Sequence, residues 1–243
     1  MEEVEITNIE AYLNLIKKNK QKQQDKSGIV DFLFRGQTVD HPLIPKICRL
    51  KAKGALLDVE SLLLHEFKRT NPLLIEAHRP MDDWDYLTLG QHFGLPTRLL
   101  DWSNNALTAL WFATAENFDL RSMHASPYAV VWILMAESDD FDLNISNTDP
   151  FQVSATKIFR PRIIKQRINN QSGVFSIHST KELLDMRYMN EIDSFNRKLI
   201  KVKIPKKAGE EINKDLDTLG VNAFSIFPEL EGLCNYLQWR YFY

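Results

Sequence analysis

GQHFGLPTRLLDW, residues Gly90 to Trp102, is the stretch on which the prediction of the fold depends. Apolar residues at helical spacing precede and follow it, which predicts one helix ending at Gly94 and another beginning just after Trp102. Gly94 can adopt the left-handed conformation of a helix terminus, and Pro96 cannot resume the helix. We therefore expect a loop between two helices that holds polar side chains in place, as binding pockets commonly do.

The rest of the chain alternates between helical and strand patterns. Helical spacing predicts helices over Ile9–Ile16, Leu56–Phe67, from Asp82 or Asp83 to Phe93, from Ser103 or Asn104 to Asn117, and after Gly232. Apolar or alternating runs predict strands over Ile29–Phe34, Tyr128–Met135, Gln171–His178 and Arg197–Ile204. This order predicts an α/β chain of the α+β type, a single domain whose central mixed sheet is flanked by helices.

Two of the predicted strands indicate their place in the sheet. Tyr128–Met135 is apolar throughout and is expected to be central, whereas the lysines that alternate through Arg197–Ile204 suggest an edge strand. Residues 1–26 are expected to form an N-terminal helix and a polar connection from Lys17 to Lys26, ahead of the main domain over residues 27–243.

Composition narrows the class of protein. The 243 residues are 44% hydrophobic and 26% charged, enough to bury a large core, and the net charge of -2 argues against a globally basic nucleic-acid binder. Cys48 and Cys234 are the only cysteines, and no apolar run suggests a signal peptide or a bilayer span. We expect a cytoplasmic protein without a membrane partner.

Standard catalytic and metal-binding motifs are missing. The sequence lacks GxxxxGK[ST], GxGxxG, GxSxG, HExxH and CxxC, which disfavours P-loop, Rossmann and common hydrolase chemistry. The six histidines are scattered, with no pair at helical ligand spacing, so no metal is expected.

One local patch departs from the slightly acidic average. Residues 157–171, KIFRPRIIKQRINNQ, contain no acidic residue and five cations: Lys157, Arg160, Arg162, Lys165 and Arg167. Such a segment can attract phosphate, or it can be the solvated face of a helix, and both interpretations stay open.

Five short motifs together resemble the FRG domain family. They are FRGQ at Phe34–Gln37, QHFGLPTRLLDW at Gln91–Trp102, ALTALWFA at Ala106–Ala113, QSGVF at Gln171–Phe175 and FPELEG at Phe227–Gly232. Their order and spacing match the family from about residue 30 to 240, with one departure at Asn105-Ala106, where the family usually has Asn-Pro. The family is often met in bacterial and phage-linked genes, so the resemblance implies a setting of conflict, such as phage defence or a toxin.

The motif order also resembles the layout of ADP-ribosyltransferases, which implies NAD as a substrate. By that analogy Arg35, His92 and Glu231 would be the catalytic residues, with Glu231 as the carboxylate beside the ribose. The cofactor-binding residues would be Arg35, Gln37, Gln91, Thr97, Arg98, Asp101 and Ser103.

Plainer interpretations stand beside these roles. Arg98 and Asp101 can meet as an ion pair that fixes the loop, His92 can be a structural donor, and Glu231 can simply oppose the dipole of a helix start.

Three functions therefore remain open. The leading one is NAD-dependent ADP-ribosyl transfer or NAD hydrolysis, with a protein or a nucleic acid as acceptor. The second is a nucleic-acid-binding or nucleic-acid-processing protein that uses the 157–171 segment. The third is a non-catalytic sensor that binds a nucleotide or a partner protein in the same pocket.

Overall fold

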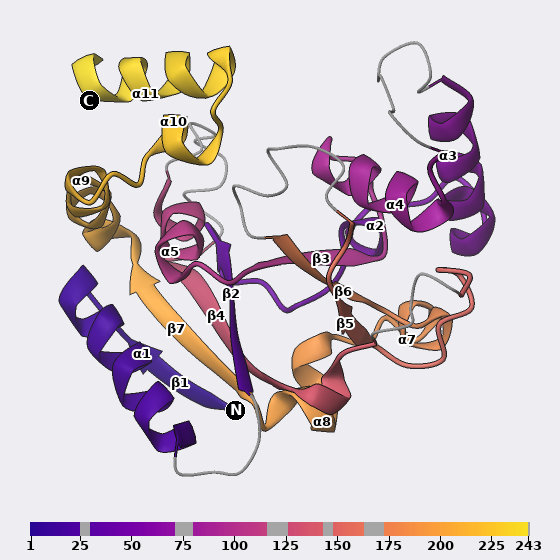
Figure 1. Ribbon diagram of the computed structural model, residues 1–243, viewed down its shortest axis with the longest axis horizontal. Helices are drawn as coiled ribbons and strands as arrows, with labels where there is room; N and C mark the ends of the chain where they lie inside the picture. The colour runs from indigo at the N-terminus through magenta and orange to yellow at the C-terminus, as the bar shows by residue number, and fades with distance from the viewer. Residues whose placement is uncertain (25–29, 71–79, 116–125, 143–147, 163–172, 243) are drawn as a thin grey trace.

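The computed structural model describes residues 1–24, 30–70, 80–115, 126–142, 148–162 and 173–242. At its centre is a sheet of seven strands in the order β1-β7-β4-β2-β3-β6-β5 (Figure 1). The strands are β1 (Glu2–Glu5), β2 (Val30–Gln37), β3 (Leu99–Ser103), β4 (Tyr128–Glu137), β5 (Lys157–Phe159), β6 (Gly173–Ile177) and β7 (Leu199–Pro205).

Helices cover the sheet and its ends. In the described residues they are α1 (Ile9–Gln24), α2 (Lys46–Arg49), α3 (Leu56–Thr70), α4 (Asp83–His92), α5 (Ala106–Thr114), α7 (Thr180–Leu184), α8 (Asp193–Asn196), α9 (Gly209–Thr218), α10 (Ala223–Ile226) and α11 (Leu230–Phe242). Among the strand pairs described, β1 and β7 run parallel and the others run antiparallel. The expectation of a mixed sheet flanked by helices is confirmed.

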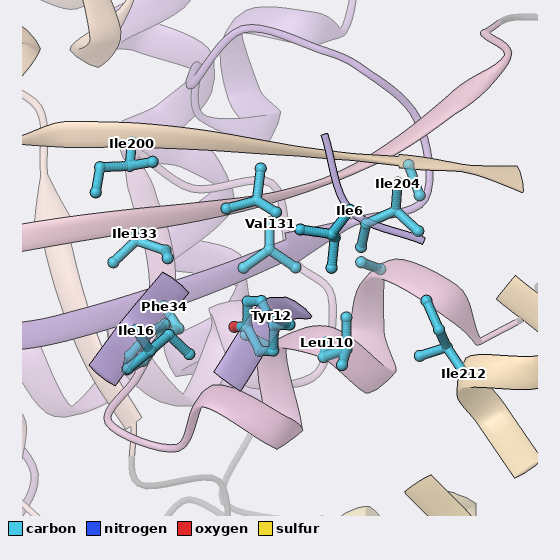
Figure 2. Packing of buried hydrophobic residues seen from close by; sticks show 14 of the residues in the cluster. Ile6, Tyr12, Ile16, Phe34, Leu110, Val131, Ile133, Ile200, Ile204 and Ile212 are labelled. Carbon is cyan, nitrogen blue, oxygen red and sulfur yellow. The ribbon is translucent and has the colours of Figure 1, made fainter. Parts of the chain in front are cut away.

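The packing of β4 explains why its sequence is apolar from Tyr128 to Ala136. Val131 and Ile133 face a core cluster that contains residues of α1, α5 and α9, and Figure 2 shows them beside Tyr12 of α1 and Leu110 of α5. Val130 and Trp132 point the other way, into a second cluster with residues of β3, β6 and α8. Because both faces are covered, the interior positions of β4 favour apolar side chains, and only its last residue, Glu137, is exposed.

The sheet is almost divided between β2 and β3. Their register contains one paired position, Phe34 opposite Ser103, whereas β2 pairs with β4 along all of its eight residues. Figure 1 shows β3 leaving β2 at a steep angle. The sheet thus consists of a four-strand group (β1, β7, β4, β2) and a three-strand group (β3, β6, β5), joined at one residue pair.

α4 and α5 flank this junction, and local signals define their ends. Asp82 caps α4 by accepting a hydrogen bond from the backbone N–H of Asp85 at 2.9 Å, and Gly94 follows the helix with a φ of +86°. Asn105 caps α5 through bonds from Leu107 and Thr108, so the cap lies one or two residues beyond the predicted Ser103 or Asn104. Ala106 starts α5.

α5 lies unusually close to β2. A Cβ atom on Gly36 would lie 2.0 Å from the carbonyl oxygen of Ala109 and 2.7 Å from the backbone nitrogen of Ala113. Ala109 and Ala113 are buried, so the small-residue spacing of this helix serves a close helix–strand contact.

The prediction of a loop from Gly90 to Trp102 was wrong at its second half. Residues Leu99–Ser103 form β3, which pairs along its whole length with β6. A five-residue strand has too few residues for its alternation to be recognised, and its conformation depends on a partner some 70 residues away in the chain.

Three other expectations need correction. The polar connection from Lys17 is part of α1, which continues to Gln24 because Lys and Gln are good helix formers. An unpredicted strand, β1, covers the outer side of β7, so β7 is not an edge strand despite its lysines. The short helix α2 lies where the sequence pattern predicts neither a helix nor a strand.

None of the described helices combines the length and the apolar character needed to cross a membrane.

Candidate functional site

A cavity of about 410 Å³ lies where β2 and β3 diverge. This volume is within the range of pockets that hold small molecules. Its lining comes from β2, α4, β3, α5, β6 and the segment between α10 and α11: Phe34, Arg35, Gly36, Gln91, His92, Asp101, Trp102, Ser103, Thr108, Ala109, Phe112, Gly173, Phe175 and Phe227. Residues from all five quoted motifs therefore meet at one place.

Arg35 connects the two strands where their backbone pairing stops. Its Nη1 donates to the backbone carbonyl of Asp101 at 2.8 Å and approaches the Oδ2 atom of the same residue at 3.4 Å. Its Nε is buried and has no hydrogen-bond partner among the described residues. Burial lowers the pKa of Arg35, the carboxylate of Asp101 opposes this, and the charge of Arg49 lowers it further.

This burial destabilises the charged form of the Arg35 guanidinium, because it loses contact with water. The Asp101 carboxylate compensates only in part, because its side chain is 52% exposed and the contact is long. An anionic group entering the cavity would supply the missing partner, so the arginine is suited to bind phosphate or a similar anion.

A chain of hydrogen bonds leads from Arg35 to the backbone of β3. Gln91 donates from Nε2 to Oδ2 of Asp101 at 2.7 Å and accepts at Oε1 from the hydroxyl of Thr97. That hydroxyl also accepts a bond from the backbone N–H of Leu99 at 3.1 Å. The end of α4 and the start of β3 are thus tied together by side chains.

Aromatic rings form part of the cavity wall, which we call the aromatic wall. Phe112 of α5 and Phe227 lie edge to face, with ring centroids 5.9 Å apart, and Trp111 packs on both. Phe112 and Phe227 are half-buried, whereas Phe34, Trp102 and Phe175 are buried in the core. A wall of this kind suits a planar ring.

The comparison with known families matches the part of the chain that builds most of this cavity. The FRG domain model matches residues 30–121, a range that includes β2, α4, β3 and α5. The chain carries an FRG domain. The match includes Arg35, Gln91, Asp101 and Phe112, while the residues of β6 and Phe227 lie beyond it. A search of curated proteins and a search of solved structures each found no match.

The structure brings some of the predicted site residues of the FRG domain together. Arg35, Gln91, His92, Asp101 and Ser103 line the cavity. His92 also contacts the ring of Phe93 edge to face at 5.1 Å.

Other predicted site residues lie outside the cavity lining. Gln37 accepts a bond from the indole N–H of Trp132 at 2.6 Å, and Thr97 is buried behind Gln91. Glu231 is exposed in the first turn of α11. The C-terminal segment reaches the cavity through Phe227 instead, against whose backbone Gly232 packs closely.

The expected ion pair between Arg98 and Asp101 is wrong. Arg98 is fully buried and pairs with Glu60 of α3, donating from Nε at 2.8 Å and from Nη2 to the second carboxylate oxygen. Asp101 points away from Arg98 toward Arg35 and Gln91 because residues on a strand alternate between faces. Arg98 therefore anchors α3 to the segment before β3.

The basic segment is less available than its composition suggests. Lys157 donates to the carbonyl of Asp139, Arg160 pairs with Asp31 at 3.0 Å, and Arg162 pairs with Asp82 at 3.3 Å. Arg160 and Arg162 line a second, smaller cavity of about 150 Å³. Lys165 and Arg167 lie outside the described residues.

Sequence reasoning missed the aromatic wall and one buried acid. Phe112 and Phe227 lie within the quoted motifs, but aromatic residues in apolar helices usually signal core packing, so nothing in the pattern marked them. Glu60 lies in α3, whose sequence has the pattern of an ordinary amphipathic helix, so nothing indicates that this acid is buried. In the described part of the chain, no cluster of three or more His, Cys, Asp or Glu side chains is arranged to hold a metal ion.

Proposed function

We propose that this FRG protein uses NAD as a substrate, cleaves the bond between nicotinamide and ribose, and passes the ADP-ribosyl group to an acceptor or to water. The observation that carries the proposal is that an arginine whose side chain is only 15% exposed, a carboxylate and aromatic rings share one cavity of about 410 Å³. A nicotinamide nucleotide carries a planar ring, a ribose and an anionic group, and its ribose gains positive charge when the glycosidic bond breaks.

Each part of the cavity matches one part of such a substrate. A planar ring can stack on Phe112 or Phe227, while a phosphate can pair with the desolvated guanidinium of Arg35. Breaking the glycosidic bond builds positive charge on the ribose, and a carboxylate in the cavity would stabilise that charge. His92 is the one histidine in the described lining.

A nucleic-acid-binding function has less support. The cations described in the basic segment each have an acidic or carbonyl partner, which reduces the charge they can offer to a phosphate backbone. A nucleic acid remains a candidate acceptor, as does a protein. NAD-consuming chemistry in the cytoplasm also suits the setting of bacterial or phage conflict that the family resemblance implies.

The test is to incubate the purified protein with NAD, alone and with protein and nucleic-acid acceptors, and to follow NAD and released nicotinamide by chromatography. We expect nicotinamide release, reduced about 100-fold in kcat/KM by Arg35→Ala because one charged contact is lost. Arg69→Ala is the matched control, since Arg69 is exposed on α3 and pairs with Glu66.

Thermal unfolding of both variants shows whether they remain folded. The proposal is wrong if the wild-type protein neither binds nor consumes NAD with any acceptor tried. Binding without turnover would instead make the protein a nucleotide sensor.

A further inference from the structure

One position of β3 does not fit its strand. Leu99, Leu100, Trp102 and Ser103 are buried, but the side chain of Asp101 is 52% exposed and lines the cavity. An acid in the interior of a short strand that is paired with β6 along its length needs a reason, because Asp is disfavoured in strands.

The contacts of Asp101 leave one of its oxygens available. Oδ2 accepts from Gln91 at 2.7 Å and faces Nη1 of Arg35 at 3.4 Å. Oδ1 has no hydrogen-bond partner among the described residues. The carboxylate is therefore held by one oxygen, and the other can reach a ligand.

The direction of the Gln91 amide follows from its two neighbours. The Thr97 hydroxyl accepts from the N–H of Leu99, so its own proton is free to go to Oε1 of Gln91. An ionised carboxylate only accepts hydrogen bonds, so Oδ2 of Asp101 needs the amide N–H. If the amide were reversed, a carbonyl oxygen would face the carboxylate and the threonine proton would lose its acceptor.

From these contacts we infer that Asp101, and not Glu231, is the catalytic carboxylate, and that Gln91 and Thr97 are positioning residues that fix its orientation. The inference rests on the proposed function and names the residue that performs its key step. Glu231 is exposed on α11 and is not part of the cavity lining, whereas Asp101 lies in the cavity with Arg35.

The reaction balances without any further cofactor. The bond between C1′ of the ribose and the nicotinamide nitrogen breaks, and its electron pair leaves with nicotinamide, which becomes neutral. Asp101 stabilises the positive charge that develops on the ribose. An oxygen of water or of an acceptor bonds to C1′ and loses its proton, which Asp101 can accept and pass to solvent.

The first test compares Asp101→Asn with Glu231→Gln, two replacements that change charge and little else. We expect Asp101→Asn to lower kcat by about 100-fold or more while NAD binding, measured by calorimetry, changes only a few-fold. The asparagine carbonyl can still accept from Arg35 and Gln91, and thermal unfolding checks that the variant is folded. Glu231→Gln should keep wild-type kcat.

Two outcomes separate this inference from the proposed function. If the wild-type protein consumes NAD but Asp101→Asn is as active, or Glu231→Gln is inactive, the inference is wrong and the proposed function stands. If the wild-type protein does not consume NAD, the proposed function fails, and the assignment of Asp101 fails with it.

The second test removes the positioning bond without touching the cavity. Thr97→Val keeps the shape of a buried side chain but lacks the hydroxyl, so Gln91 loses the group that fixes its direction. We expect kcat to fall about 10-fold with KM unchanged, because the carboxylate is misoriented and not removed. Thr97→Ser keeps the hydroxyl and should restore kcat.

A merely structural role for Thr97 would give a different pattern. In that case Thr97→Val would lower the melting temperature, because the N–H of Leu99 loses its acceptor, and kcat of the folded enzyme would stay unchanged. That result would overturn the positioning role and leave the Asp101 comparison as a separate measurement.

Discussion

His178 is the most exceptional single residue outside the cavity. It follows β6, is fully buried, and neither ring nitrogen has a hydrogen-bond partner among the described residues. Burial lowers its pKa to about 4, with the nearby Glu182 opposing the shift and Arg98 adding to it. The imidazole is therefore neutral in the folded protein at neutral pH.

This residue predicts a loss of stability in mild acid. The unfolded chain takes up a proton on His178 near pH 6.5 but the folded protein does so only near pH 4, so protons favour unfolding throughout that interval. At 1.36 kcal/mol per pH unit the free energy of unfolding should fall by about 3 kcal/mol. Urea unfolding at a series of pH values measures this change in the free energy of unfolding.

His178→Leu provides the comparison, because it has no proton to gain. The difference in unfolding free energy between wild type and variant should change with pH across this interval. An identical pH dependence in both proteins would show that other groups cause the acid sensitivity.

The sequence does not show in which direction a side chain points, and this limits the prediction of single contacts. Arg35, Gln91, His92, Asp101 and Ser103, which the motif resemblance points to, line one cavity, and their roles stay predictions. Arg98 was paired with the wrong acid because its partner, Glu60, lies 38 positions earlier in the chain and nothing local points to it. Which face of a strand a residue occupies depends on register, which no short stretch of sequence contains.

Among the elements, α4 and β3 show where local sequence suffices and where it does not. The start of α4 at Asp82 and its end before Gly94 were predictable, because a cap and a left-handed glycine act within a few residues. β3 was missed because β6, and not its own five residues, determines its conformation.

The contact between α5 and β2 predicts a large effect for Gly36→Ala. The new methyl group would meet backbone atoms of Ala109 and Ala113, which cannot move without shifting the whole helix. We expect a loss of about 1–3 kcal/mol in the free energy of unfolding, measured in denaturant. Because α5 carries Phe112, ligand binding should weaken as well.

Gly54→Ala is the control for this prediction. A Cβ atom there would find its nearest neighbour, Cγ2 of Val59, at an ordinary 3.7 Å. Equal stability of the two variants would mean that α5 does not approach β2 as closely as described.

The buried pair between α3 and the start of β3 predicts strongly non-additive mutations. Glu60→Leu or Arg98→Met alone leaves one buried charge without its partner and should cost about 3–5 kcal/mol. The double variant Glu60→Leu with Arg98→Met removes both charges and should cost much less than the sum. Unfolding free energies of the four proteins measure this, and simple additivity would contradict it.

At the scale of the whole molecule, the position of the cavity could not be predicted. Composition and periodicity predicted a mixed sheet flanked by helices, and the structure has one. The periodicity of the sequence does not indicate that β2 and β3 share a single paired position. The cavity lies where these two strands diverge. The motif resemblance therefore supplies candidate residues, and the three-dimensional arrangement shows which of them line the cavity.

Because β2 and β3 share a single paired position, the cavity lies at the boundary between the two strand groups, and this boundary matters for unfolding as well as for binding. A ligand that touches Arg35, Asp101 and Phe175 would contact both strand groups and would therefore stabilise their association. Without it, we expect backbone amides of the two groups to exchange with deuterium at distinct rates, as separate cooperative units. With a bound nucleotide the two exchange rates should converge. Ligand binding would then determine whether the two strand groups unfold separately or as a single cooperative unit.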